Sequence, residues 1–172
     1  MKAILVLMLA TMPIMAQTAA VFEKACGPEK APFEVKLVKA QRPPKDPESG
    51  KALVFFIQDV GITRCVGCVT MRIGVDGTWV GALEYNSYFY VSVEPGEHRL
   101  CAFPQQGYLQ KLIGLVHFTA EAGKTYYFRD RLFSQLDQAL VDFQPIDRDM
   151  GEYFTATFQV SESHPKGRAG EK

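Results

Sequence analysis

Apolar residues alternate with polar ones, or gather in short blocks, along most of the chain between residues 51 and 145. Alternation is typical of a strand with one buried face, and the apolar block at residues 52–57 is typical of a strand buried on both faces. These segments recur about every ten residues with turn residues between them, which predicts a β-sandwich or an open barrel. The predicted strands are residues 52–57, 71–75, 78–83, 88–93, 98–103, 112–118, 125–129 and 139–143.

Two pairs of residues between these segments predict tight turns. Asp76 and Gly77 form the pair preferred in two-residue hairpins, because glycine tolerates a positive φ. Pro95 and Gly96 suit the central positions of a type II turn. Strands joined by such short turns run antiparallel, so we expect a mainly antiparallel sandwich.

One helix is predicted near the C-terminal end of the chain. Asp147 is a suitable N-cap, and Met150, Phe154 and Phe158 recur every four residues, which places them on one helical face. Gly151 weakens this helix by about 1 kcal/mol relative to alanine. The expected fold class is therefore all-β, mainly an antiparallel β-sandwich, with one short C-terminal helix.

The N-terminal residues 1–20 have the pattern of a secretory signal peptide. Lys2 precedes an unbroken apolar run at residues 3–10, and small residues follow at Ala16 and Ala20. The run is shorter than the ~20 apolar residues of a spanning helix, so we expect cleavage after Ala16 or Ala20 and no membrane-spanning segment afterwards. Charged residues before Cys26 argue against lipid attachment there.

The rest of the chain divides into three parts by composition. Residues 21–50 form a leader segment rich in proline and lysine, in which residues 33–38 are the one stretch with a strand pattern. We expect residues 51–160 to form the β-sandwich domain and residues 161–172 to form a disordered tail. Lys+Arg and Asp+Glu both number 19, so charge gives no reason to expect nucleic acid as a partner.

Five short motifs carry a resemblance to a known family. They are Ile73-Gly74-Val75-Asp76-Gly77, Val80-Gly81, Tyr88-Phe89, Val93-Glu94-Pro95-Gly96-Glu97-His98 and Ala120-Glu121-Ala122-Gly123-Lys124-Thr125-Tyr126-Tyr127. Through them the stretch from Ala52 to about Phe143 resembles the bacterial envelope domains of the DUF2846 family, and more loosely the PEGA-type β-modules. The resemblance implies a β-sandwich-like fold in the cell envelope. It implies no catalytic residue, because the shared motifs are turns and strands.

Four cysteines follow the signal pattern, namely Cys26, Cys65, Cys68 and Cys101. An even number of cysteines in an exported chain favours disulfide bonds, and four of them allow three pairings. We favour Cys101 with Cys65 or Cys68, because the loop that holds those two leads into the neighbouring hairpin. Cys26 would then tether the leader segment to the remaining cysteine.

The spacing of Cys65 and Cys68 is also that of thiol–disulfide exchange proteins. In those proteins the first cysteine lies at a helix N-terminus, which lowers its pKa, whereas here the strand-like residues 69–73 follow. Zinc would need four ligands, with His98 and Cys101 as distant partners of the close pair. A redox role for Cys65 and Cys68 is therefore the alternative, and no metal or cofactor is expected.

Catalytic residues are not predicted. His98 and His117 lie on predicted strands, and pairing of either with Glu97 or Glu121 would be the start of acid–base catalysis. The sequence has no nucleophile motif, phosphate-binding loop or serine elbow to accompany such a pair. We therefore expect that the protein is not an enzyme.

Aromatic residues around the hairpins offer the first candidate binding face, made of Trp79, Tyr88 and Tyr90. The two tyrosines share one face of their strand, while Phe89 and Val91 share the other and make the better core. Exposed aromatic faces supply large contact areas for a sugar or a protein.

The sequence as a whole predicts an exported, non-enzymatic β-sandwich module of the bacterial cell envelope, periplasmic or extracellular. We expect a binding or structural accessory role, with an envelope protein or a glycan as the unknown partner. The alternative is a periplasmic thiol–disulfide protein that uses Cys65 and Cys68.

Overall fold

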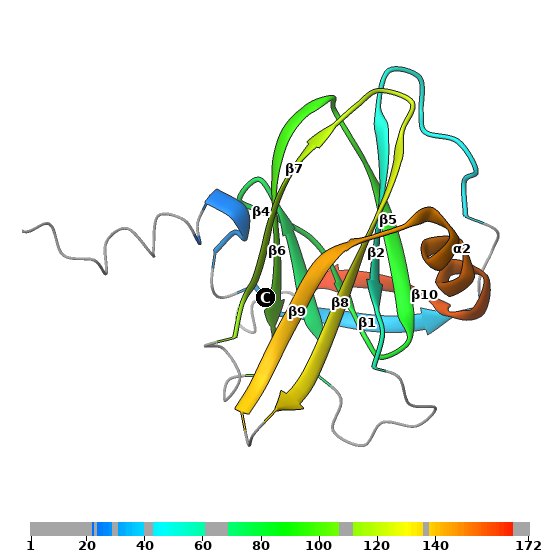
Figure 1. Ribbon diagram of the computed structural model, residues 1–172. Coiled ribbons are helices and arrows are strands. Elements are labelled where there is room, and N and C mark those ends of the chain that lie inside the picture. Colours follow the sequence, from blue (N-terminus) through cyan, green and yellow to red (C-terminus); the bar gives the residue numbers. More distant parts are fainter. Residues whose placement is uncertain are drawn as a thin grey trace, which may run out of the picture.

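The computed structural model describes residues 22, 24–28, 31–39, 43–60, 69–106, 112–135 and 138–166. The elements are β1 Phe33–Val38, β2 Ala52–Gln58, β3 Met71–Val75, β4 Thr78–Leu83, β5 Ser87–Val93, β6 Gly96–Pro104, β7 Gly114–Ala120, β8 Thr125–Gln135, β9 Gln138–Ile146, α2 Arg148–Thr157 and β10 Gln159–Pro165. The strands form a six-stranded sheet in the order β1-β10-β5-β2-β8-β9 and a four-stranded sheet in the order β4-β3-β6-β7. The two sheets pack on one another, with α2 beside the six-stranded sheet (Figure 1). The expected β-sandwich with a short C-terminal helix is confirmed.

The core between the sheets is built from alternate residues of the strands. Val54 and Phe56 of β2 face Ile73 of β3 and Leu100 of β6, and Phe128 of β8 joins them. All five side chains are at most 1% exposed. Because side chains alternate along a strand, the neighbours of these residues point out of the sandwich, where further layers cover them.

The outer face of the six-stranded sheet carries a second cluster, beneath the helix. Leu53, Phe55 and Ile57 of β2 pack there with Phe154 of α2, so β2 is buried on both faces as its sequence predicts. Asp147 is the N-cap, and its side chain accepts a hydrogen bond from the Met150 backbone N–H at 2.8 Å.

Helix α2 differs from its sequence pattern in one respect. Phe154 is buried, but Met150 is 41% exposed and Phe158 is the C-cap with an extended backbone, so the three residues do not form one buried stripe. Gly151 packs directly against the Tyr127 ring, which leaves no room for a Cβ. Among the described residues, no helix has the length and apolar character needed to cross a membrane.

The predicted disordered tail is wrong for residues 161–165, which belong to β10. This strand pairs with β1 along its length and with β5 at Gln159 and Val160. Its serines also bind the edge of the other sheet: Ser161 donates to the Ala82 carbonyl at 2.7 Å, and the Ala82 N–H donates to Ser163 at 2.9 Å. These hydroxyl hydrogen bonds add to the backbone pairing of β10, and they leave no apolar period in the sequence.

Candidate functional site

A disulfide joins Cys26 to Cys101 of β6, with the two Cα atoms 5.1 Å apart. Both cysteines are completely buried. The preferred pairing of Cys101 with Cys65 or Cys68 is therefore wrong. Leu100 and Ala102 face the core, so Cys101 points to the outer face of the four-stranded sheet, where the segment around Cys26 lies.

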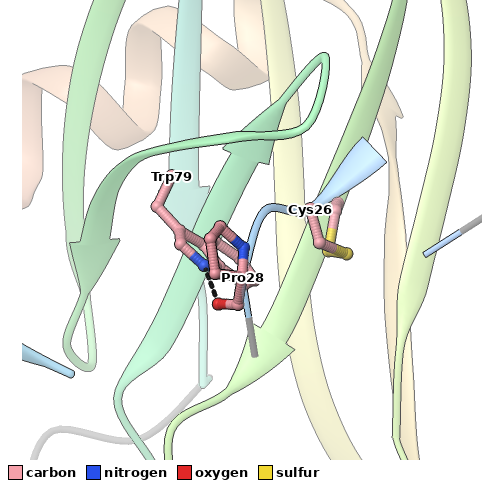
Figure 2. The surroundings of a disulfide bond; sticks show 4 residues. Cys26, Pro28 and Trp79 are labelled. Carbon is pink, nitrogen blue, oxygen red and sulfur yellow. Dashed lines mark hydrogen bonds between the residues drawn. A yellow bond between two sulfur atoms is a disulfide. The ribbon is translucent and has the colours of Figure 1, made fainter. Parts of the chain in front are cut away.

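Trp79 of β4 holds this N-terminal segment beside the disulfide (Figure 2). Its indole Nε1–H donates to the Pro28 carbonyl at 2.6 Å. The ring of Phe22 packs edge-on against Phe103, with 5.1 Å between centroids, and also contacts Trp79. Trp79 thus anchors the protein's own chain, and the expected role of this residue in a shared binding face does not agree with its surroundings.

Arg72 of β3 completes this cluster and is a residue that the sequence patterns did not predict for the site. The side chain is 2% exposed, and its guanidinium carbon lies 4.6 Å from the Trp79 ring centroid and 4.9 Å from that of Phe103. Its Nη1 donates to the Ala31 carbonyl at 3.2 Å. Cation–π attraction of this kind strengthens when the cation is desolvated, so Arg72 ties the leader segment to the sheet. The sequence feature that could have indicated this role is the single charged residue within an otherwise apolar short strand.

The expected tyrosine face is also corrected. Tyr88 is completely buried in the cluster beneath α2, and this burial raises the pKa of its hydroxyl. Tyr90 is 41% exposed and packs against Phe55, with 5.4 Å between ring centroids. Trp79 lies on the outer face of the other sheet, so Trp79, Tyr88 and Tyr90 do not share one surface.

Exposed apolar side chains nevertheless remain on the helix side of the sandwich. Tyr90 of β5 and two residues of α2, Met150 at 41% and Tyr153 at 60% exposure, are the large ones there. We call these three residues the helix-side apolar group. Leu115 of β7, on the other sheet, is exposed to a similar degree at 44%.

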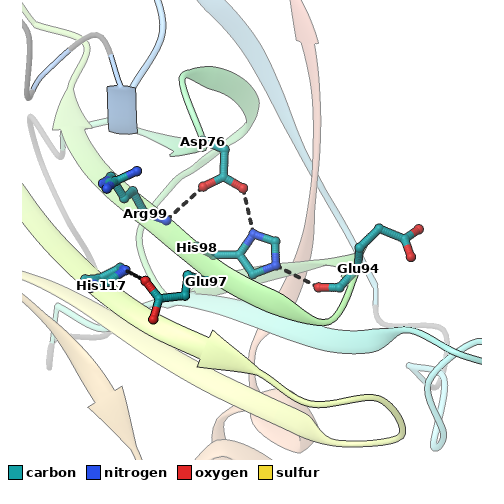
Figure 3. A network of polar contacts seen from close by, with 6 residues as sticks. All are labelled: Asp76, Glu94, Glu97, His98, Arg99 and His117. Atoms are coloured by element: carbon teal, nitrogen blue, oxygen red, sulfur yellow. Dashed lines mark hydrogen bonds and ion pairs between the residues drawn. The ribbon is translucent and has the colours of Figure 1, made fainter.

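A polar network links two turns at one end of the sandwich (Figure 3). His98 Nδ1 lies 2.6 Å from Asp76 Oδ2, and His98 Nε2 lies 2.7 Å from the Glu94 carbonyl oxygen. The other Asp76 oxygen accepts from the Arg99 N–H at 2.8 Å. Both ring nitrogens face acceptors, so both hydrogen bonds form only when the ring is a doubly protonated imidazolium.

The pKa of His98 follows from this geometry. Burial of the ring by itself lowers the pKa, but the hydrogen bonds to the Glu94 carbonyl and the Asp76 carboxylate outweigh burial. The pKa of His98 is therefore raised above the ordinary histidine value. Its charged form joins the Asp76 hairpin to the turn at Glu94.

His117 belongs to a separate pair. Its Nε2 lies 3.1 Å from Glu97 Oε2, and both side chains are exposed. Glu97 and His98 are consecutive in β6 and point to opposite faces, so the histidines and acids do not converge on one site (Figure 3). Within the described part of the chain, no three His, Cys, Asp or Glu side chains gather closely enough to hold a metal ion.

Cys65 and Cys68 lie outside the described residues, so their proposed redox role stays a prediction. The alternative of a zinc site with Cys101 and His98 as ligands does not agree with the contacts of these two residues. Cys101 is bonded to Cys26, and both ring nitrogens of His98 are engaged.

Comparison with known proteins gives no match: no family model fits the chain, and no curated protein or solved structure is significantly similar to it. The resemblance to the DUF2846 family therefore stays a prediction that depends on its turn and strand motifs.

Proposed function

We propose that this chain is an exported, non-enzymatic β-sandwich module of the bacterial cell envelope, with a binding or structural accessory role. The observation that carries the proposal is the buried Cys26–Cys101 disulfide. Disulfides form and persist in oxidising compartments, and buried cysteines are chemically inert. The bond fastens the segment that follows the signal-peptide pattern, so export and folding would be linked.

The polar groups support an accessory role in preference to a catalytic one. His98 and Asp76 are used to join two turns, and His117 and Glu97 form an exposed pair on the other face of the sheet. Acid–base catalysis needs a positioned reacting group as well as a histidine–carboxylate pair. These contacts therefore favour structure over chemistry.

The helix-side apolar group of Tyr90, Met150 and Tyr153 is the surface we assign to binding. Aromatic side chains offer a large apolar area together with a polar hydroxyl, which suits both protein surfaces and sugar rings. The partner class is an envelope protein or an envelope glycan. The Trp79 side of the sandwich is occupied by the chain's own N-terminal segment.

Export is tested with the full chain, expressed in a bacterium that has separate cytosolic and periplasmic fractions. We expect a mature product that begins at Gln17 or Val21, in which Cys26 and Cys101 react with a thiol label only after reduction. Leu7→Arg, which breaks the apolar run, is the matched control and should stay in the cytosol. An unprocessed cytosolic product with all four thiols free would contradict the proposal.

Binding is tested with the purified mature protein on immobilised peptidoglycan and on detergent-solubilised envelope membrane proteins. We expect retention on one of these, reduced by Tyr153→Ser and unchanged by Leu115→Ser, which removes an exposed apolar side chain from the other sheet. Cleavage of the peptidoglycan by the protein, with no retention on either material, would overturn the non-enzymatic role.

One observation favours the alternative function enough to test it. Since Cys26 and Cys101 are bonded to each other, Cys65 and Cys68 are the two cysteines that remain in the chain. Their thiol–disulfide equilibrium in glutathione buffers would give a reduction potential. A value below about −300 mV indicates a structural bond, and a higher value favours a thiol–disulfide exchange function.

A further inference from the structure

Asp130 of β8 lies inside the sandwich. Phe128 and Leu132, two residues to either side, belong to the core between the sheets, so the Asp130 side chain points into the same space. It is completely buried. Its neighbour in the β2–β8 register is Gln58, which is 1% exposed and lies on the same face as Phe56.

These two buried side chains have more acceptors than donors. Neither oxygen of the Asp130 carboxyl, nor the Gln58 Oε1, has a hydrogen-bond partner among the residues that the structure describes. One N–H of the Gln58 amide donates to the Val69 carbonyl at 3.0 Å, and neither Asp130 oxygen accepts from the other N–H. A buried acceptor without a donor destabilises the folded state, and an unpaired buried carboxylate destabilises it more.

Among the described residues, the neighbouring arginines form ion pairs with carboxylates other than that of Asp130. Arg129 lies 4.0 Å from Asp59 and 3.8 Å from Asp142, and Arg131 lies 3.7 Å from Asp59, all on the outer face of the sheet. The two arginines are thus paired with other carboxylates. Burial raises the pKa of Asp130 to about 8, and the nearby Asp142 carboxylate adds to the rise.

We propose that Asp130 is protonated in the folded protein and donates a hydrogen bond to Gln58 Oε1, so that this end of the sandwich loosens when the proton is lost. In the unfolded chain Asp130 is ionised at neutral pH, and folding therefore takes up one proton from solvent. The proton stays on the carboxyl, and no other bond changes.

The position of Gln58 explains why loss of this proton acts on the fold. Through Val69, the Gln58 amide links the end of β2 to the residues that lead into β3 of the other sheet. The Asp59 N–H also donates to the Asp130 carbonyl at 3.0 Å, at the same end of β2. An ionised Asp130 carboxyl beside these contacts draws water between the sheets. We therefore expect this end of the sandwich to open locally at alkaline pH.

The test is the pH dependence of urea unfolding for the mature protein and for Asp130→Asn, which has nearly the same shape and keeps a donor for Gln58. Between the ordinary aspartate pKa of about 4 and the raised value, the folded state holds one proton more than the unfolded state. We expect the folding equilibrium constant of the wild type to fall about tenfold per pH unit more steeply than that of Asp130→Asn. Asp142→Asn, which removes a carboxylate on the outer face, should keep the steep dependence.

Infrared spectroscopy of the wild type gives an independent readout, which applies even if Asp130→Asn does not fold. We expect the C=O stretch of one protonated carboxyl at pH 6, its loss at pH 10, and faster amide exchange at Gln58 and Val69 after the loss. Equal pH dependence of wild type and Asp130→Asn would overturn the proposal, as would a spectrum at pH 6 with ionised carboxylates alone. Both measurements use purified protein, so their outcome is independent of export and partner binding.

Discussion

Gly74 of β3 lies directly beneath Cys26, so that a Cβ at Gly74 would be 2.7 Å from the Cys26 Cα. The backbone of the N-terminal segment rests on this glycine. The close approach brings Cys26 within reach of Cys101, which is the register neighbour of Gly74 on β6.

Gly74→Ala should therefore push the N-terminal segment away from the sheet. We expect the free energy of unfolding to fall by about 1–3 kcal/mol, the usual cost of an extra methyl group in a packed site. We also expect slower oxidation of Cys26 and Cys101 during refolding, measured by quenching with a thiol label. Thr78→Ala, at an exposed position in the same hairpin, should leave both unchanged.

Removal of the disulfide should be more costly. The bond closes a loop with a sequence separation of 75 residues, and restriction of the unfolded chain by such a loop is worth about 4 kcal/mol. Cys26→Ala with Cys101→Ala should lower the urea midpoint accordingly. Trp79 is the single tryptophan, so its fluorescence should shift to the red in the double variant as the segment detaches. An unchanged emission maximum would show that the segment stays docked without the bond.

Because the pKa of His98 is raised in the folded state, we expect the stability of the protein to fall as pH rises. The contribution of His98 is fully present below the ordinary pKa of about 6.5 and is lost as pH rises through the folded value. We expect the His98 ring resonances to titrate above about 6.5 in the wild type and lower in Asp76→Asn. Below a pH of about 6.5, the free energy of unfolding should be lower in His98→Gln than in the wild type and should be unchanged in His117→Gln. A pKa of His98 below the ordinary value would contradict a charged His98 that joins the two turns.

Gly151→Ala sets helix propensity against packing. Alanine favours a helix by about 1 kcal/mol over glycine, but a Cβ at this position overlaps the Tyr127 ring. Overpacking costs about 1–3 kcal/mol, so we expect a net loss of stability in urea unfolding. Ala156→Gly, at an exposed site of α2, measures propensity alone and should cost about 1 kcal/mol. A more stable Gly151→Ala protein would show that the Tyr127 ring moves aside freely.

Local patterns predicted the strands well because each pattern reflects chemistry within a few residues. β3 and β4 have the predicted bounds, and residues 33–38 form the edge strand β1. Asp76 and Gly77 both have positive φ in the hairpin that joins β3 to β4. β10 was missed because Ser161 and Ser163 bind a distant strand edge through hydroxyl groups, which leaves no apolar period in the sequence.

The candidate site was predicted less well, for a related reason. Tyr88 and Tyr90 were correctly placed on one strand face, but α2 covers Tyr88 and leaves Tyr90 exposed. His98 was recognised as a polar strand residue, while its partner Asp76 comes from another hairpin.

The amino-acid sequence alone determined the β class, the turns, the helix cap and the alternation of faces along each strand, because these depend on neighbouring residues. Only the tertiary structure decided what covers each face: the N-terminal segment over Cys101, and α2 over Tyr88. The alternation of side chains along a strand shows which of them share a face. The residues that those side chains contact depend on long-range packing. The disulfide partner of Cys26 and the buried state of Asp130 both follow from that packing.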